Sequence, residues 1–267
     1  MSGVWGKAPR PSATAPTKPK EEDDLTEMES AFSRTELLLG KRAVEKLSGA
    51  RVAVIGLGGV GGAAAEALAR GGVGTLILTD ADIVSPSNLN RQLIATASSM
   101  GAKKTEAMAK RIADAAPSCK TELRDIFLLP ENIGGFLDES RPGYLLDAID
   151  TISSKIALAC ECQKRGIPII SCMGAGNKLD PTRFVVSDIY KTVVCRICRV
   201  MRKELKVRGV AALKVVYSDE PPVPRHPEAD IPIPAGKRRS VPGSVSFVPP
   251  VVGIIAAGEI IKDLAAR

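Results

Sequence analysis

The chain has 267 residues, a net charge of +7, six scattered cysteines and only 3% aromatic residues. A chain of this length can bury roughly 70–75% of the surface of its unfolded form, so a large domain with a full hydrophobic core is expected. The lone histidine, His226, lies in a proline-rich run, which argues against histidine-based catalysis and histidine-rich metal sites. The cysteine pattern and an N-terminus without an apolar signal region predict free thiols in the cytoplasm.

The two ends of the sequence differ from its centre. Residues 1–24 are rich in Pro, Ala, Thr and Lys and close with four acids, which predicts a disordered tail before a single domain over residues 25–267. Residues 32–47 have apolar residues near helical spacing and predict a helical arm over the core. Residues 245–261 form a long apolar run, but two prolines and a glutamate interrupt it. We therefore expect no membrane span, and a short strand followed by a buried helix over residues 251–264.

Residues 51–91 contain the pattern around which the fold is predicted. An apolar run, residues 52–55, leads into a glycine turn and an alanine-rich segment, which is the order strand, turn, helix. The glycines of the turn are Gly56, Gly58, Gly59 and Gly61. A second apolar run, Thr75–Thr79, ends in Asp80, 19 residues after Gly61, where nucleotide-binding units place an acid on the ribose. Glycines let phosphates approach the backbone, so we predict a nucleotide site.

The remaining sequence alternates predicted strands with predicted helices. The expected helices are 101–116, 130–139 and 152–165, and the expected strands are 120–124, 144–149 and 167–172. This alternation predicts an α/β fold with a doubly wound, mostly parallel Rossmann-like sheet. After Gly174 the pattern changes to alternating strands at 184–188 and 213–218 around a basic helix at 197–206, so antiparallel C-terminal strands are expected. Residues 190–243 form a basic, proline-rich region that we expect on the substrate side.

The loop after Asp80 favours ATP over a dinucleotide. Asn88, Arg91 and Gln92 lie just past the second strand, and Lys104 lies at the start of the next helix, on its polar side together with Lys103 and Lys110. Ligands bind at this edge of open parallel sheets. The leaving pyrophosphate of an ATP-cleaving enzyme develops charge, and each charge-assisted hydrogen bond contributes about 1.5–3 kcal/mol. A nicotinamide-dependent oxidoreductase or dinucleotide sensor has no such need and is the alternative from another class.

Asp150 follows the apolar run 144–149. A carboxylate at this end of a central strand, beside a phosphate site, is a natural ligand for Mg²⁺. It could instead cap the helix that begins at Ile152. Asp147, inside the same run, is expected to be structural.

The order of these residues resembles that of the ubiquitin-activating-enzyme-like adenylyltransferases, from about Phe32 to the C-terminus. The shared pattern is GxGGxG, an acid after the second strand, NxxR-Q, a lysine, and an aspartate after the fourth strand. Within this superfamily, four strings are similar to the tRNA threonylcarbamoyladenosine dehydratase family. They are FSRTELLLG (32–40), CMGAGNKLDPTRF (172–184), DIYKT (188–192) and VPGSVSFVPPVVG (241–253).

The resemblance implies a role for each predicted site residue. ATP phosphates would lie on the glycine turn and the ribose on Asp80. The triphosphate would be held by Ser87, Asn88, Arg91, Gln92 and Lys104. Mg²⁺ would bind Asp150, and Arg34 matches an arginine that reaches the phosphates from the other subunit of a homodimer. The expected catalytic residues are Arg91, Lys104, Asp150 and Arg34.

The implied reaction is the ATP-dependent cyclisation of threonylcarbamoyladenosine in tRNA through an acyl-adenylate. The alternative within the superfamily is an enzyme that activates the C-terminal Gly-Gly of a ubiquitin-like sulfur carrier. Such members typically hold a structural zinc with two CxxC pairs, whereas this sequence has one, Cys195 and Cys198, so zinc is not expected. That pair departs from the pattern of the dehydratases, and its chemical role, like a sulfur-relay protein partner, stays open.

The basic C-terminal third fits the tRNA substrate that the resemblance implies. Residues 191–239 contain twelve Lys or Arg against five Asp or Glu, which accounts for the whole net charge. A solvated basic surface without a partner is the alternative. Tyr190 and Tyr217 are the nearest candidates for base stacking, so contacts to the RNA backbone should dominate and binding should depend on salt. The basic residues are Arg196, Arg199, Arg202, Lys203, Lys206 and Arg208 on the helix and Lys237, Arg238 and Arg239 beyond it.

Overall fold

The computed structural model of the protein describes residues 31–224, 226–228 and 242–266. Its strands are β1 (Arg51–Ile55), β2 (Thr75–Thr79), β3 (Lys120–Arg124), β4 (Tyr144–Asp147), β5 (Ile169–Cys172), β6 (Phe184–Asp188) and β7 (Lys214–Ser218). They form one sheet in the order β3-β2-β1-β4-β5-β7-β6, in which only the β6–β7 pair is antiparallel. The predicted doubly wound, mostly parallel sheet with antiparallel C-terminal strands is confirmed, and these strands are β6 and β7. The predicted tail, residues 1–24, lies outside the described residues.

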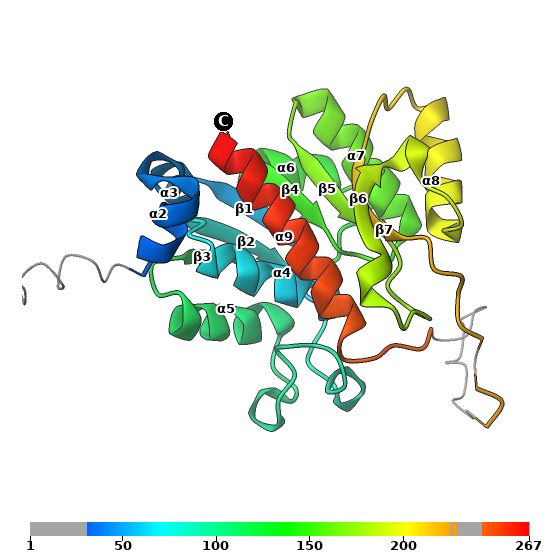
Figure 1. Cartoon of the computed structure of the whole chain (residues 1–267), viewed down its shortest axis with the longest axis horizontal. Helices are drawn as coiled ribbons and strands as arrows, with labels where there is room; N and C mark the ends of the chain where they lie inside the picture. Colours follow the sequence, from blue (N-terminus) through cyan, green and yellow to red (C-terminus); the bar gives the residue numbers. More distant parts are fainter. Residues whose placement is uncertain (1–30, 225, 229–241, 267) are drawn as a thin grey trace, which may run out of the picture.

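Helices cover both faces of the sheet (Figure 1). They are α2 (Ser33–Leu39), α3 (Lys41–Ser48), α4 (Gly59–Arg70), α5 (Lys104–Ala115), α6 (Ile133–Ser140), α7 (Ile152–Arg165), α8 (Arg196–Val207) and α9 (Val248–Ala266). The helices α3, α4, α5 and α9 share one core with the sheet, α6 and α7 pack in a second, and α7 and α8 in a third. The central strands read as continuous apolar runs because both of their faces are covered.

The N-terminal arm is two helices rather than one. Gly40 has a φ of 83° and separates α2 from α3. Ala43, Val44 and Leu47 of α3 are buried, as expected for an arm that covers the core. The expectation is wrong for α2, which buries no residue and leaves Leu37 exposed.

The C-terminal helix begins earlier than predicted. The strand expected before it is absent from residues 242–247, and α9 starts at Val248. Pro249 and Pro250 fit there because the first turn of a helix leaves its N–H groups without intrahelical acceptors. α9 lies directly across α4, and a Cβ on Gly253 would stand 2.2 Å from the carbonyl oxygen of Val60, so only glycine allows this approach. Within the described residues, no helix is long and apolar enough to cross a bilayer.

Candidate functional site

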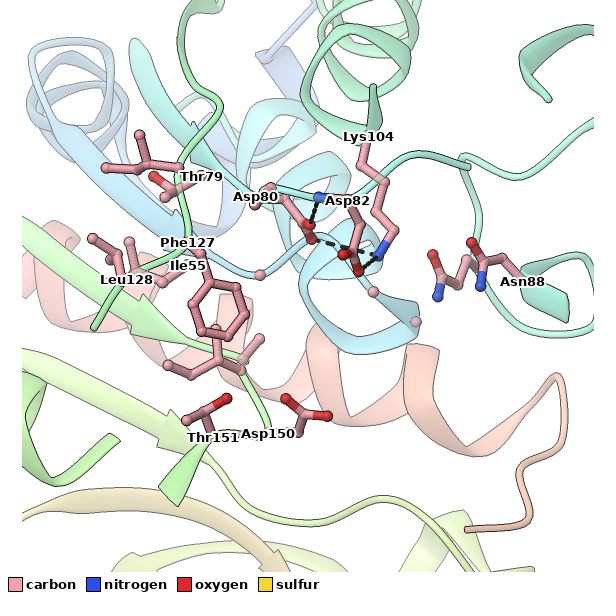
Figure 2. Close-up of a pocket in the computed structure, with 18 of the residues that line it drawn as sticks. Ile55, Thr79, Asp80, Asp82, Asn88, Lys104, Phe127, Leu128, Asp150 and Thr151 are labelled. Atoms are coloured by element: carbon pink, nitrogen blue, oxygen red, sulfur yellow. Dashed lines mark hydrogen bonds and ion pairs between the residues drawn. The ribbon is translucent and has the colours of Figure 1, made fainter. Parts of the chain in front are cut away.

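A cavity of about 340 Å³ opens at the carboxyl ends of β1, β2 and β4. Figure 2 shows that its walls come from the glycine turn, the loop after β2, the start of α5 and the turn between β4 and α7. Segments far apart in the sequence therefore meet at one edge of the sheet, as predicted. The predicted residues that line the cavity are Gly56, Gly58, Gly59, Asp80, Asn88, Arg91, Gln92, Lys104 and Asp150.

Gly61 belongs to the turn but does not line the cavity. A Cβ on Gly61 would lie 1.7 Å from the carbonyl oxygen of Gly56, so the first turn of α4 packs directly on the backbone of the glycine turn. Gly58, by contrast, precedes α4, and a Cβ there would meet no atom within 4 Å. Gly61 therefore shapes the turn, while Gly58 forms part of the surface that a ligand can reach.

The carboxylate of Asp80 joins two loops of the site. Its Oδ2 accepts a 2.7 Å hydrogen bond from the backbone N–H of Leu57 in the glycine turn. Its Oδ1 accepts a 2.9 Å hydrogen bond from the N–H of Asp82. Each carboxylate oxygen has a second lone pair, so Asp80 can still accept a ligand hydroxyl while it holds the turn.

Lys104 is buried, not on the polar side of its helix as predicted. Its side chain lies in the first turn of α5 and only 5% of the residue is exposed. The Nζ atom lies 2.7 Å from Oδ2 of Asp82 and 3.7 Å from Oδ2 of Asp80 (Figure 2). Asp82 is a site residue that was not predicted, although an acid two residues after Asp80 is a visible signal in the sequence.

The loop after β2 is held by its own side chains. Oδ1 of Asn88 accepts a 3.0 Å hydrogen bond from the N–H of Ser85, and this bond belongs to a capping box. Nη1 of Arg91 donates to the carbonyl oxygen of Ser87 at 2.9 Å. The hydroxyl of Ser87 contacts that of Ser85 at 3.0 Å, and Ser87 does not line the cavity. In the described structure, Oε1 of Gln92 is buried at the cavity without a hydrogen-bond partner.

Asp150 lies on the opposite wall of the cavity, at the turn between β4 and α7 (Figure 2). The N-cap of α7 is Thr151, so the alternative that Asp150 caps this helix is wrong. Asp150 is exposed, and among the described residues no hydrogen bond or ion pair holds its carboxylate.

The turn that carries Asp150 rests on a buried ion pair. Asp147 is 0% exposed and Lys155 1%, and Nζ of Lys155 lies 3.0 Å from Oδ2 of Asp147. The same ammonium donates to the carbonyl oxygens of Ile149 at 3.1 Å and Cys172 at 2.8 Å. Asp147 is therefore structural, as expected, and Lys155 is an unpredicted support of the site.

One side of the cavity is apolar. Ile126, Phe127 and Leu128 follow β3 and line it, and Phe127 points across the cavity toward the turn at Asp150 (Figure 2). Phe127 is 55% exposed. An aromatic ring exposed at a cavity of this size is a surface on which a planar ligand group can lie. These three residues were not predicted as part of the site, although an apolar run past the end of a strand is their signal in the sequence.

Arg34 lies on α2, is exposed, and does not line the cavity of its own chain. The structure therefore does not bring it together with the other predicted site residues. Its predicted role in the site of a second subunit stays a prediction.

The basic helix has the expected position on the surface. Its exposed cations are Arg196, Arg199, Lys203, Lys206 and Arg208. Arg202 is instead tied to the carbonyl oxygen of Thr192 at 2.9 Å. Tyr217 is buried and is therefore unsuited to base stacking, contrary to expectation. The hydroxyl of Tyr190 donates a hydrogen bond to the carbonyl oxygen of Val210. Residues 237–239 lie outside the described part of the chain.

The fold and the cavity define a nucleotide-binding α/β protein. The sequence profile of the ThiF family matches residues 32–267. The chain is 44% identical over 243 residues to the tRNA threonylcarbamoyladenosine dehydratase of Bacillus subtilis (strain 168), covering 87% of this chain and 94% of that protein. The crystal structure of E. coli tRNA N6-threonylcarbamoyladenosine dehydratase in complex with ATP superposes with a TM-score of 0.78 at 32% identity, covering 88% of this chain and 94% of that one.

The similarity to a sulfur-carrier enzyme is shorter. The chain is 32% identical over 137 residues to the sulfur carrier protein ThiS adenylyltransferase of E. coli (strain K12), covering 51% of this chain and 54% of that protein. The chain thus belongs to the ThiF family and, within it, to the tRNA threonylcarbamoyladenosine dehydratases.

Proposed function

We propose that the chain is an ATP-dependent enzyme that cyclises threonylcarbamoyladenosine in tRNA by adenylating its carboxylate. The observation that carries this proposal is the combination of a glycine turn, Arg91 and Lys104 around one cavity, in a chain that matches a dehydratase over nearly the whole length of both proteins. The relative from E. coli was crystallised with ATP, which supports ATP as the nucleotide.

The lining of the cavity suggests how ATP would lie in it. The backbone N–H groups at the start of α4 and the exposed surface at Gly58 suit the phosphates. Lys104, Arg91 and the amide of Gln92 add donors on the same side. The ribose would meet Asp80, and the apolar side at Phe127 would take the base.

Mg²⁺ fits the site through Asp150. Magnesium usually binds one or two carboxylates together with substrate phosphates and water, so a full protein cage is not required. The described residues contain no group of three or more potential metal ligands, which agrees with a site of that kind. The carboxylate oxygens of Asp80 already accept hydrogen bonds from the backbone N–H groups of Leu57 and Asp82, whereas the carboxylate of Asp150 faces the cavity. When bound, the ion would supply positive charge to the departing pyrophosphate.

The proposed chemistry has two steps. The threonyl carboxylate of the modified nucleoside attacks the α-phosphate of ATP, forming an acyl-adenylate and releasing pyrophosphate, whose charge Lys104 and Arg91 stabilise. The carbamoyl group of the same nucleoside then attacks the activated carbonyl and releases AMP, which carries away one carboxylate oxygen. The second step is intramolecular, so it benefits from a high effective molarity and needs no covalent enzyme intermediate.

The partners follow from this reaction. We propose that tRNA lies along α8, whose exposed cations can neutralise backbone phosphates in a salt-dependent manner. A homodimer is proposed because Arg34 does not line the cavity of its own chain, and a second subunit would supply it. The tRNA substrate and the free thiols are consistent with a cytoplasmic enzyme.

The experiment that tests the proposal combines purified protein, ATP, Mg²⁺ and tRNA that carries threonylcarbamoyladenosine. The nucleoside should become lighter by one water, as measured by mass spectrometry after digestion. A matched reaction with a sulfur carrier ending in Gly-Gly should not stimulate pyrophosphate exchange. An unchanged nucleoside mass with folded, ATP-binding protein would refute the dehydratase activity, and exchange stimulated only by the carrier would support the alternative.

A further inference from the structure

Asn90 joins Arg91 to the segment that leads into α9. Its Oδ1 atom accepts a 2.9 Å hydrogen bond from Nη1 of Arg91, and its Nδ2 atom donates a 3.1 Å hydrogen bond to the carbonyl oxygen of Ser244. One amide group therefore holds both the side chain of Arg91 and a backbone position 154 residues further along the chain. Asn90 is exposed and does not line the cavity, whereas Arg91 does.

The hydrogen bonds of Arg91 leave one edge of its guanidinium group open. Nη1 carries two hydrogens, and its two acceptors are the carbonyl oxygen of Ser87 and Oδ1 of Asn90, each at 2.9 Å. Within the described part of the chain, no hydrogen bond or ion pair holds Nε or Nη2. These two atoms form an edge of the guanidinium group that can bind two phosphate oxygens at once. Ser87 and Asn90 thus fix the plane of the group and leave its phosphate-binding edge free.

The backbone of Arg91 is fixed as well. Its N–H donates to the carbonyl oxygen of Asn88 at 3.1 Å. A Cβ on Gly59 would stand 3.1 Å from the carbonyl oxygen of Arg91 and 2.9 Å from Cβ of Pro249, so the glycine turn, this loop and the start of α9 pack directly together. The freedom that remains to Arg91 is therefore in its side chain, and Asn90 is one of the two groups that limit it.

The segment on which Asn90 is anchored is held from a second side. The N–H of Gly243 donates to Oδ1 of Asn177 at 2.7 Å, and the N–H of Asn177 donates to the carbonyl oxygen of Gly243 at 2.8 Å. Asn177 follows β5 and has a φ of 55°, a left-handed conformation that asparagine adopts more readily than most residues. Gly243 and Ser244 are thus fixed to the loop after β5 and to the loop after β2, which gives Asn90 a firm anchor.

We propose that Asn90 is a positioning residue, which uses its anchor on Ser244 to orient Arg91 toward the β- and γ-phosphates of ATP. This role rests on the proposed function, in which Arg91 stabilises the charge of the departing pyrophosphate. A long side chain loses rotamer freedom when it binds a ligand, and an arginine that is already oriented has less freedom to lose. AMP lacks both of these phosphates, so its affinity does not depend on Asn90.

Titration calorimetry of the full chain with ATP and with AMP tests this role. Asn90→Ala should weaken ATP binding about three- to tenfold, the cost of immobilising one long side chain, and should leave AMP binding unchanged. Asn90→Gln keeps an amide group and should bind ATP more tightly than Asn90→Ala does. Leu89→Ala is the control in the same loop, since its side chain is 53% exposed, and it should bind both nucleotides as the unaltered chain does.

A purely structural role for Asn90 gives a different result. If Asn90 only holds the loop after β2 against Ser244, its loss should distort the whole cavity, and Asn90→Ala would weaken ATP and AMP binding to the same extent. That result would overturn the proposal, and so would ATP binding by Asn90→Ala that equals that of the unaltered chain.

A double-mutant cycle shows whether Asn90 acts through Arg91. In the Arg91→Ala background, the further change Asn90→Ala should alter ATP affinity by less than about twofold, because the group that Asn90 orients is already gone. An equal loss of affinity in both backgrounds would contradict the proposal.

These binding measurements need no tRNA, so they are independent of the test of the proposed dehydratase activity. An unchanged nucleoside mass together with the expected ATP and AMP affinities would refute the cyclisation and leave the role of Asn90 supported. The expected mass change together with an additive double-mutant cycle would support the cyclisation and refute the role of Asn90.

Discussion

Two glycines at the start of α4 should respond in opposite ways to an added methyl group. At Gly58, φ is −72° and a Cβ meets no atom within 4 Å, so alanine fits the folded backbone. At Gly61, a Cβ would stand 1.7 Å from the carbonyl oxygen of Gly56 and 3.2 Å from Cβ of Ala148. Gly58→Ala therefore tests the ligand surface, whereas Gly61→Ala tests the packing of the turn.

The magnitudes follow from these contacts. Gly58→Ala should leave the free energy of unfolding unchanged or raise it by up to about 1 kcal/mol, since alanine restricts the unfolded chain. Its methyl group should keep phosphates from the amides of the turn, and the loss of one hydrogen bond worth about 1.5–3 kcal/mol lowers ATP affinity about tenfold or more. Gly61→Ala should lower the free energy of unfolding by about 3 kcal/mol, the upper end for overpacked cores.

Urea denaturation and ATP titration calorimetry measure the two effects separately. The matched control is Gly135→Ala in α6, where a Cβ meets nothing within 4 Å and the residue does not line the cavity. It should bind ATP normally. The reasoning is refuted if Gly58→Ala binds ATP as tightly as the unaltered chain, or if Gly61→Ala is equally stable.

Three further substitutions probe the charges of the molecule. Lys104→Met should lower the rate of ATP–pyrophosphate exchange at least about tenfold, because one charge-assisted hydrogen bond to the phosphates is lost. The circular dichroism spectrum should stay unchanged. Full exchange activity would show that Lys104 does not take part in the site. Lys155→Met should lower the free energy of unfolding in urea by about 3–5 kcal/mol, because it leaves Asp147 charged and buried; a loss below 1 kcal/mol would contradict this. Burial alone would raise the pKa of Glu66, but hydrogen bonds from two arginines lower it below its ordinary value of 4.5. The stabilisation by Glu66 is thus present above pH 4.5 and disappears as the pH falls through the folded-state pKa, so Glu66→Gln should lower thermal stability at pH 7 and much less near pH 3.

The fold could be predicted because its signals are local. Continuous apolar runs mark the buried strands, and the glycine turn fixes the first crossover. Two predictions at the ends of the chain were wrong, namely the burial of α2 and the strand before α9. Both rested on local sequence patterns, whereas burial and strand pairing depend on tertiary contacts. Apolar residues near helical spacing run through residues 32–47, but α2 buries none of its residues against the described part of the chain. Residues 242–247 precede α9 without pairing to the sheet.

The site was predicted less completely because burial and side-chain partners depend on long-range packing. Lys104 looked like a surface residue of a polar helix face, yet the start of α5 turns it toward Asp82. Lys155 lies in an ordinary helical stretch, and only the sheet brings it to Asp147. Phe127 lies at the cavity because of the path that the chain takes after β3, and the spacing of apolar residues in the sequence does not predict that path.

The charge balance of the cavity explains why a cation belongs in the proposed reaction. Three carboxylates, Asp80, Asp82 and Asp150, line the cavity against two cations, Arg91 and Lys104. Lys104 is already paired with Asp82 at 2.7 Å, so before any ligand binds its charge is largely neutralised. A triphosphate brings several negative charges into this acidic lining, and positive charges must compensate them. Mg²⁺ on Asp150, and transfer of Lys104 from Asp82 to the phosphates, would together supply that compensation.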